Sequence, residues 1–149
     1  MIKTEGKFTY IEEGEGTPLI LLHGLMGGVD NFGSMVDIVA EAGFKVLAPD
    51  LQLFEVPLLK TSIKYLSEYL NDFMQHKKLE KAVLVGNSLG GHIALVFSKK
   101  YPEKVSGMVL TGSSGLYENS MGDSFPRRGD YNYIKEKTEE VFYDPKTAT

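Results

Sequence analysis

One stretch of twelve residues constrains the fold of this chain more than any other. Residues 81–92 read KAVLVGNSLGGH, an apolar and β-branched run followed by a turn of the pattern small-x-Ser-x-small and then by helix-compatible residues. The pattern predicts a buried strand, a tight turn with Ser88 at its tip, and a helix. Gly86 and Gly90 fit such a turn because side chains there would collide. We expect Ser88 to adopt a strained conformation with positive φ.

This arrangement, Gly-x-Ser-x-Gly between a strand and a helix, is the nucleophile elbow, and it makes Ser88 a candidate nucleophile. Glycine-rich turns between strands and helices also occur in α/β proteins as packing devices. The motif alone leaves both interpretations open, and a second motif is needed to favour one.

The second motif lies at residues 17–28, TPLILLHGLMGG, where another buried-type strand ends at a glycine-rich loop. Taken with the downstream turn, it resembles the α/β-hydrolase family, whose members place a His-Gly loop after the third strand. The resemblance covers nearly the whole chain. It implies that Ser88 is the catalytic nucleophile and that the backbone N–H groups of Leu25 and Leu89 form the oxyanion hole, with Met26 the near alternative to Leu25.

The same resemblance implies that His23, Gly24 and Met26 contribute to substrate binding and that His23 has a structural hydrogen-bonding role. It implies no cofactor and no metal. Leu89 also opens the predicted helix, so the positive end of the helix dipole adds to the oxyanion site.

A catalytic base is missing from the pattern. Serine needs an adjacent base, and in this fold the chain order is Ser, then Asp or Glu, then His. His92 follows Ser88 but lies one turn along the outgoing helix, where we expect a structural role. His76 lies in a polar helix end and is expected at the surface, and neither Asp123 nor Asp130 is assigned as the acid. We therefore expect the 149-residue chain alone to be inactive.

Strands alternate with helices along the chain. We expect strands over 7–13, 19–22, 45–50 and 105–110 besides the one before Ser88, and helices from Asp30 or Asn31 to Gly43, over 61–77, and after Ser88. The alternation predicts an α/β fold with a mostly parallel sheet and helices on both faces. Residues 51–57 are apolar where family members have a glycine-rich loop, and we expect them to pack under a helix rather than line a substrate entrance.

The domain organisation expected from the resemblance is the N-terminal part of an α/β-hydrolase core over 1–115 and the start of a helical cap over 116–149. A helix start signal at Asp144-Pro145 is followed by only a few residues. We therefore expect the chain to be an N-terminal half, cut short at the start of the cap. Strand 105–110 would then be an open edge, predicting self-association or binding of a complementary C-terminal fragment.

Composition excludes several classes of function. A net charge of −4 with no basic stripe argues against nucleic-acid binding. The chain has no cysteine, which excludes disulfides, thiolate metal sites and a thiol nucleophile. No secretory start and no long apolar run is present, so we expect a cytoplasmic protein with no membrane partner.

The function expected is that of a serine hydrolase. It would act on an ester, thioester, amide or activated C–C bond of a small molecule, by acyl transfer to water through an acyl-enzyme. The alternative is a non-catalytic binding module on the same scaffold, because fold does not imply function. A nucleotide-binding α/β domain is a third interpretation, but residues 24–28 fit neither glycine-rich phosphate-binding pattern.

Overall fold

The structure is a computed structural model that describes residues 2–53, 62–116 and 132. The chain divides into two units, Met1–Leu116 and Tyr117–Thr149. The expected cap segment falls almost wholly in the second unit. Its predicted helix start at Asp144 lies outside the described residues.

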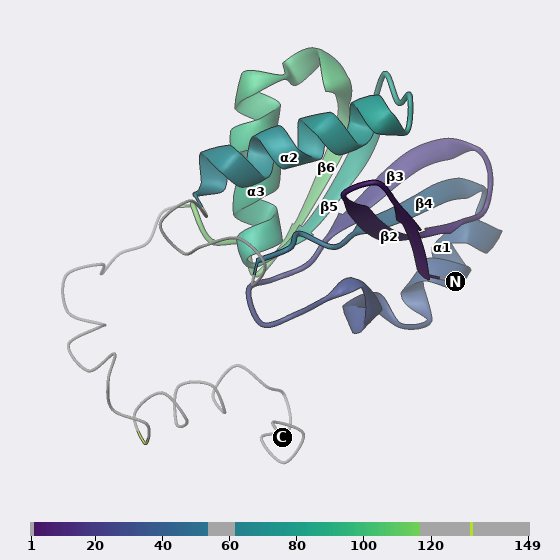
Figure 1. The fold of residues 1–149 in the computed structure, drawn as a ribbon, viewed down its shortest axis with the longest axis horizontal. Helices are drawn as coiled ribbons and strands as arrows, with labels where there is room; N and C mark the ends of the chain where they lie inside the picture. Colours follow the sequence, from purple (N-terminus) through teal and green to yellow (C-terminus); the bar gives the residue numbers. More distant parts are fainter. Residues whose placement is uncertain (1, 54–61, 117–131, 133–149) are drawn as a thin grey trace. The chain divides into compact units, whose positions relative to one another are not determined.

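The first unit is built on a six-stranded sheet (Figure 1). Its strands are β1 (Ile2–Glu5), β2 (Phe8–Glu13), β3 (Thr17–Leu22), β4 (Phe44–Pro49), β5 (Ala82–Asn87) and β6 (Val105–Thr111). They lie in the order β1-β2-β4-β3-β5-β6. The β1–β2 and β2–β4 pairs are antiparallel, and the β4–β3, β3–β5 and β5–β6 pairs are parallel. The expected mostly parallel sheet is confirmed, whereas β1 was not predicted.

Helices cover both faces of the sheet, as the alternation predicts. Figure 1 shows α2 (Ile63–His76) and α3 (Leu89–Lys100) together on one face and α1 (Met35–Glu41) on the other. Two short 3₁₀ helices, η1 (Val29–Phe32) and η2 (Pro102–Lys104), complete the unit.

Strand β3 is apolar on both faces because it lies between two cores. Ile20 and Leu22 contact the larger core under α2 and α3, while Leu19 and Leu21 contact the smaller core under α1. Such two-sided burial is typical of a central parallel strand. Because β3 and β5 are parallel neighbours, their carboxyl ends lie side by side, and the two glycine-rich loops that follow them meet at one edge of the sheet.

The segment after β4 packs as expected where it is described. Leu51 and Leu53 are buried, and both belong to the larger core. The remaining positions of that segment, 54–57, lie outside the described residues.

The helix predicted to end at Gly43 begins later than expected. The helix expected from Asp30 or Asn31 is divided: those residues lie in η1, and α1 begins only at Met35. Gly33 separates the two, with a φ of 44° that interrupts a right-handed helix. The side chain of Met35, the first residue of α1, is 38% exposed.

Candidate active site

Ser88 occupies the turn between β5 and α3. Its φ of 51° and ψ of −115° lie in a region that non-glycine residues rarely adopt. The predicted positive φ is confirmed. Strain of this kind persists only where the surrounding structure imposes it.

Two glycines leave room for this turn. A Cβ placed on Gly86 would lie 2.6 Å from the backbone of Gly90 and from the Cα of Gly91. A Cβ on Gly90 would overlap the carbonyl group of Leu22 at the end of β3. Since all of these neighbours are backbone atoms, neither position has space for a side chain.

Backbone hydrogen bonds hold Ser88 from both sides. Its amide donates to the carbonyl oxygen of Thr111, 3.0 Å away at the end of β6. Its own carbonyl oxygen accepts from the amides of Gly91, His92 and Ser114 at 3.1–3.2 Å. The turn is thus fixed by the start of α3 and by the loop that follows β6.

His23 anchors the loop after β3. The ring is buried, and its Nε2 accepts a hydrogen bond from the Leu51 amide at 3.1 Å. The other ring nitrogen, Nδ1, therefore bears the proton and donates to the Gly24 carbonyl oxygen at 2.8 Å. Both nitrogens are occupied by backbone groups, so His23 is suited to a structural role and not to that of a base.

The two loops contact each other at Gly24 and Ser88. A Cβ on Gly24 would lie 3.4 Å from the Ser88 Cβ. The loop then turns at once, because the Gly27 amide donates to the Gly24 carbonyl oxygen at 3.2 Å. The structure therefore brings the predicted nucleophile and the predicted oxyanion loop side by side.

The two predicted oxyanion donors, the backbone amides of Leu25 and Leu89, directly follow Gly24 and Ser88 in the sequence. Leu89 is the first residue of α3, so its amide has no acceptor within the helix. The side chains of Leu25 and Met26 are exposed, at 57% and 79%. Met26 is not among the described residues that line the pocket next to this turn.

None of the three histidines, all described, hydrogen-bonds to the Ser88 hydroxyl. His92 is half-buried on α3, and its ring lies where a Cβ on Gly115 would be. His76 lies at the end of α2, where its Nε2 is 2.9 Å from the Glu5 carboxylate. Both positions agree with the structural and surface roles expected.

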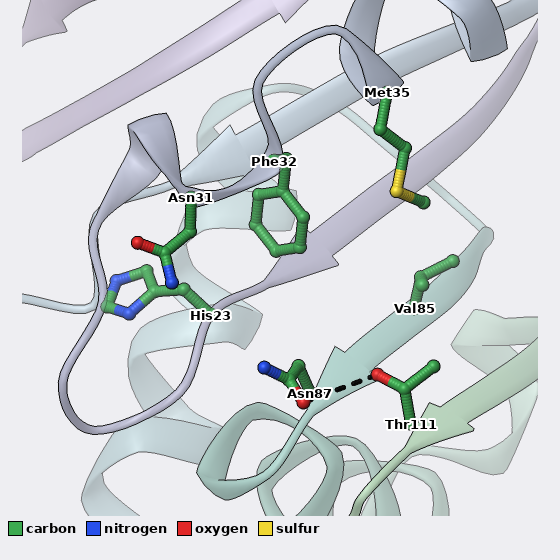
Figure 2. A pocket seen from close by; sticks show the side chains of 7 residues that line it. All are labelled: His23, Asn31, Phe32, Met35, Val85, Asn87 and Thr111. Carbon is green, nitrogen blue, oxygen red and sulfur yellow. Dashed lines mark hydrogen bonds between the residues drawn. The ribbon is translucent and has the colours of Figure 1, made fainter. Parts of the chain in front are cut away.

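A pocket of about 270 Å³ adjoins the turn on the α1 face of the sheet. Figure 2 shows the side chains that line it: His23, Asn31, Phe32, Met35, Val85, Asn87 and Thr111. The sequence interpretation missed all of these except His23 as site residues. Strand alternation could have found two of them, because Asn87 and Val85, one and three positions before Ser88, point to the same face.

The part of the chain that the structure describes holds no group of three or more His, Asp or Glu side chains suited to a metal ion. The helices of that part are too short or too polar to cross a membrane.

The amino-acid sequence is similar to those of known hydrolases. The chain is 32% identical over 145 residues to Lipase 1 of Psychrobacter immobilis, covering 92% of this chain and 45% of the lipase. It is 34% identical over 118 residues to 2-hydroxy-6-oxo-6-phenylhexa-2,4-dienoate hydrolase of Comamonas testosteroni, covering 72% of this chain and 40% of that enzyme. The chain thus spans about half the length of the curated relatives it matches.

Solved structures agree with the sequence relatives. An alpha/beta hydrolase enzyme from the metagenome of lagoon sediments at Mar Chica, Morocco, has a TM-score of 0.75 and 48% identity, over 95% of this chain and 58% of that one. The sequence model for the alpha/beta hydrolase fold matches residues 17–143. Because this family model matches most of the chain, and because the solved relative shares its fold, the chain belongs to the alpha/beta hydrolase family.

Proposed function

We propose that this chain is part of a serine hydrolase that cleaves a small ester-like substrate, with Ser88 as the nucleophile. The observation that carries the proposal is the contact between two loops: Ser88, at a φ of 51°, lies against Gly24 of the His-Gly loop. A strained serine beside a glycine-rich turn is the arrangement that acyl transfer needs, because the hydroxyl and the oxyanion donors must meet at one carbonyl.

The proposed reaction has two halves. The Ser88 hydroxyl oxygen attacks the substrate carbonyl carbon while a base removes its proton, and the leaving group departs with that proton to give an acyl-enzyme. Water then attacks the acyl carbon, the acid is released, and the proton returns to Ser88. In both halves the negative oxygen is held by the amides of Leu25 and Leu89, with Met26 the alternative to Leu25. Removing one such donor typically costs about 2.7–4 kcal/mol of transition-state stabilisation.

We propose that the base and its carboxylate partner belong to the region of the full-length protein that this chain does not span, since the chain covers about half the length of its relatives. His23 is committed to backbone groups, and His76 and His92 are placed elsewhere. We likewise propose that residues 1–115 are the N-terminal part of the catalytic core and that 116–149 begin a cap.

The names of the relatives suggest which substrate bonds the protein hydrolyses. One is named as a lipase and another as a hydrolase of a phenylhexadienoate, so the proposed substrate bond is an ester or an activated C–C bond. The alternative, a binding module that keeps the turn without turnover, predicts the same fold and no covalent chemistry at Ser88.

Reaction with a fluorophosphonate probe separates these two functions. In the full-length gene product we expect one adduct on Ser88 and hydrolysis of p-nitrophenyl esters, both lost in Ser88→Ala. Ser98→Ala is the matched control, because the Ser98 hydroxyl lies on the same helix, α3, and donates to the Leu95 carbonyl oxygen. For the 149-residue chain alone we expect little or no turnover. A folded full-length protein that neither reacts with the probe nor hydrolyses any ester would favour the binding module.

A further inference from the structure

We infer that the pocket beside Ser88 binds the acyl chain of the substrate, that this chain is uncharged and of medium length, and that Met35 limits its length. The inference rests on the proposed function and names the substrate class for it: esters of acids such as hexanoic acid.

The position of the pocket supports an acyl chain. Asn87, which lines the pocket, immediately precedes Ser88, and Val85 lines it two residues further back on the same face of β5. Three residues of strand span roughly 10 Å. An acyl group bound to Ser88 and extended along β5 toward α1 would pass Asn87 first and approach Val85.

The pocket has polar and apolar walls, and Figure 2 shows the side chains of both. Near the turn, the side chains are polar: the Thr111 hydroxyl is 3.4 Å from the Asn87 amide oxygen. Further along, the walls are Phe32, Met35 and Val85, which present only apolar atoms and sulfur.

The charge of the pocket favours a neutral chain. The side chains that line it include no carboxylate, lysine or arginine, and both ring nitrogens of its one histidine, His23, are hydrogen-bonded to backbone groups. A carboxylate at the far end of the chain would lose its hydration among apolar side chains without gaining a counter-charge, which is costly.

Met35 is the residue that can set the length. It is the first residue of α1, it lines the pocket, and it is 38% exposed, so a larger side chain there can enter the pocket without displacing the core. Ile38 lies one turn further along α1, is more exposed and does not line the pocket. It provides a matched control on the same helix.

The first experiment measures kcat/KM of the full-length gene product for p-nitrophenyl acetate, hexanoate and laurate. Each buried CH₂ contributes about fourfold, so we expect hexanoate to exceed acetate by at least about tenfold and laurate to fall below hexanoate. Met35→Trp should lower the hexanoate-to-acetate ratio of kcat/KM at least about fivefold by filling the pocket. Ile38→Trp should leave the ratio unchanged. A folded Met35→Trp protein with the wild-type ratio overturns the inference.

The second experiment does not depend on turnover. Methionine methyl groups are labelled with ¹³C, Met35 is assigned through Met35→Leu, and the protein is titrated with hexanamide or acetamide. We expect hexanamide, but not acetamide, to shift the Met35 methyl signal, and we expect the signal of Met74, a buried residue of α2, to stay in place. No shift at Met35 overturns the inference even if esters are hydrolysed. A shift in a protein that hydrolyses no ester supports the pocket and rejects the hydrolase function instead.

Discussion

The Ser114 amide donates a hydrogen bond to the Ser88 carbonyl oxygen over 3.2 Å, and so ties the loop after β6 to the turn between β5 and α3. The Ser114 hydroxyl lies 3.4 Å from the same oxygen. With the Thr111 carbonyl accepting from the Ser88 amide, β6 and its loop satisfy both backbone groups of a residue whose conformation is unfavourable in isolation. The strain at Ser88 is therefore maintained by a segment more than twenty residues away in sequence.

Relief of this strain should be measurable. Ser88→Gly is expected to raise the free energy of unfolding by about 1 kcal/mol relative to Ser88→Ala, because glycine accepts positive φ while alanine retains the strain. Glycine also increases the entropy of the unfolded chain, which reduces the gain. Urea denaturation of the two variants makes the comparison. An alanine variant as stable as the glycine variant would show that the turn is not strained.

The close approach of α3 to β5 gives a steric prediction. Gly86→Ala should destabilise the protein by about 1–3 kcal/mol, since the new methyl group meets backbone atoms that have no room to move. Gly107→Ala, on the neighbouring strand β6, is the control. A Cβ there meets only the Val83 methyl groups at 3.8 Å, so this substitution should be neutral or stabilising. Thermal unfolding of both variants tests the difference, and equal effects would contradict the steric explanation.

A cluster of ion pairs around Glu12 of β2 predicts sensitivity of the fold to acid. Burial alone would raise the pKa of Glu12, but hydrogen bonds from Lys45, Lys77 and Lys3, at 3.0–3.1 Å, lower it from 4.5 to about 2. A carboxyl group whose pKa is lowered by folding stabilises the protein fully above pH 4.5. This contribution is lost as the pH falls toward 2.

Glu12→Gln should therefore lower the free energy of unfolding by roughly 3 kcal/mol at pH 7 and have little effect at pH 2. Unfolding is measured at both pH values, with Glu15→Gln, at an exposed position in the β2–β3 turn, as the control. A Glu12→Gln effect that does not change with pH would mean that the side chain acts through packing and not through its charge.

One buried hydroxyl on α2 predicts a stabilising substitution. The Ser67 hydroxyl is fully buried and has no hydrogen-bond partner in the described part of the chain. Leaving a buried donor unsatisfied costs about 1–3 kcal/mol, and alanine is the better helix former. Ser67→Ala should raise the midpoint of thermal unfolding, whereas Ser98→Ala, which removes an existing hydrogen bond to Leu95, should not. A lower midpoint for Ser67→Ala would show that the hydroxyl is satisfied in solution.

The sequence predicted the sheet and the turn because each has a strong local signal. The apolar run before Ser88 and the paired glycines around it leave few alternatives, and β3 is apolar at every position from Leu19 to Leu22. Strand β1 was missed because Ile2–Glu5 is polar and exposed at the edge of the sheet, and is defined by its pairing with β2 and not by burial.

The pocket was harder to predict for a physical reason. Asn31 and Phe32 lie in η1 and Met35 begins α1, and the positive φ of Gly33 divides the single helix that the sequence predicts over this stretch. A backbone reversal at a single glycine leaves no periodic signal. The support that Thr111 and Ser114 give to the turn is equally hidden, because it depends on contacts between segments distant in the sequence.

The last prediction concerns the β6 edge. Among the described residues β6 pairs only with β5, and Met108 and Val109 are exposed along it, Val109 at 50%. Unpaired N–H and C=O groups beside apolar side chains form a template for pairing with another strand. We therefore expect the 149-residue chain to self-associate, or to bind a complementary C-terminal fragment, through β6. Val109→Lys should shift its light-scattering mass toward 16.5 kDa, whereas Ile2→Lys, on the exposed strand β1 at the opposite edge, should not. A monodisperse wild-type monomer at micromolar concentration, with no bound fragment, would contradict this expectation.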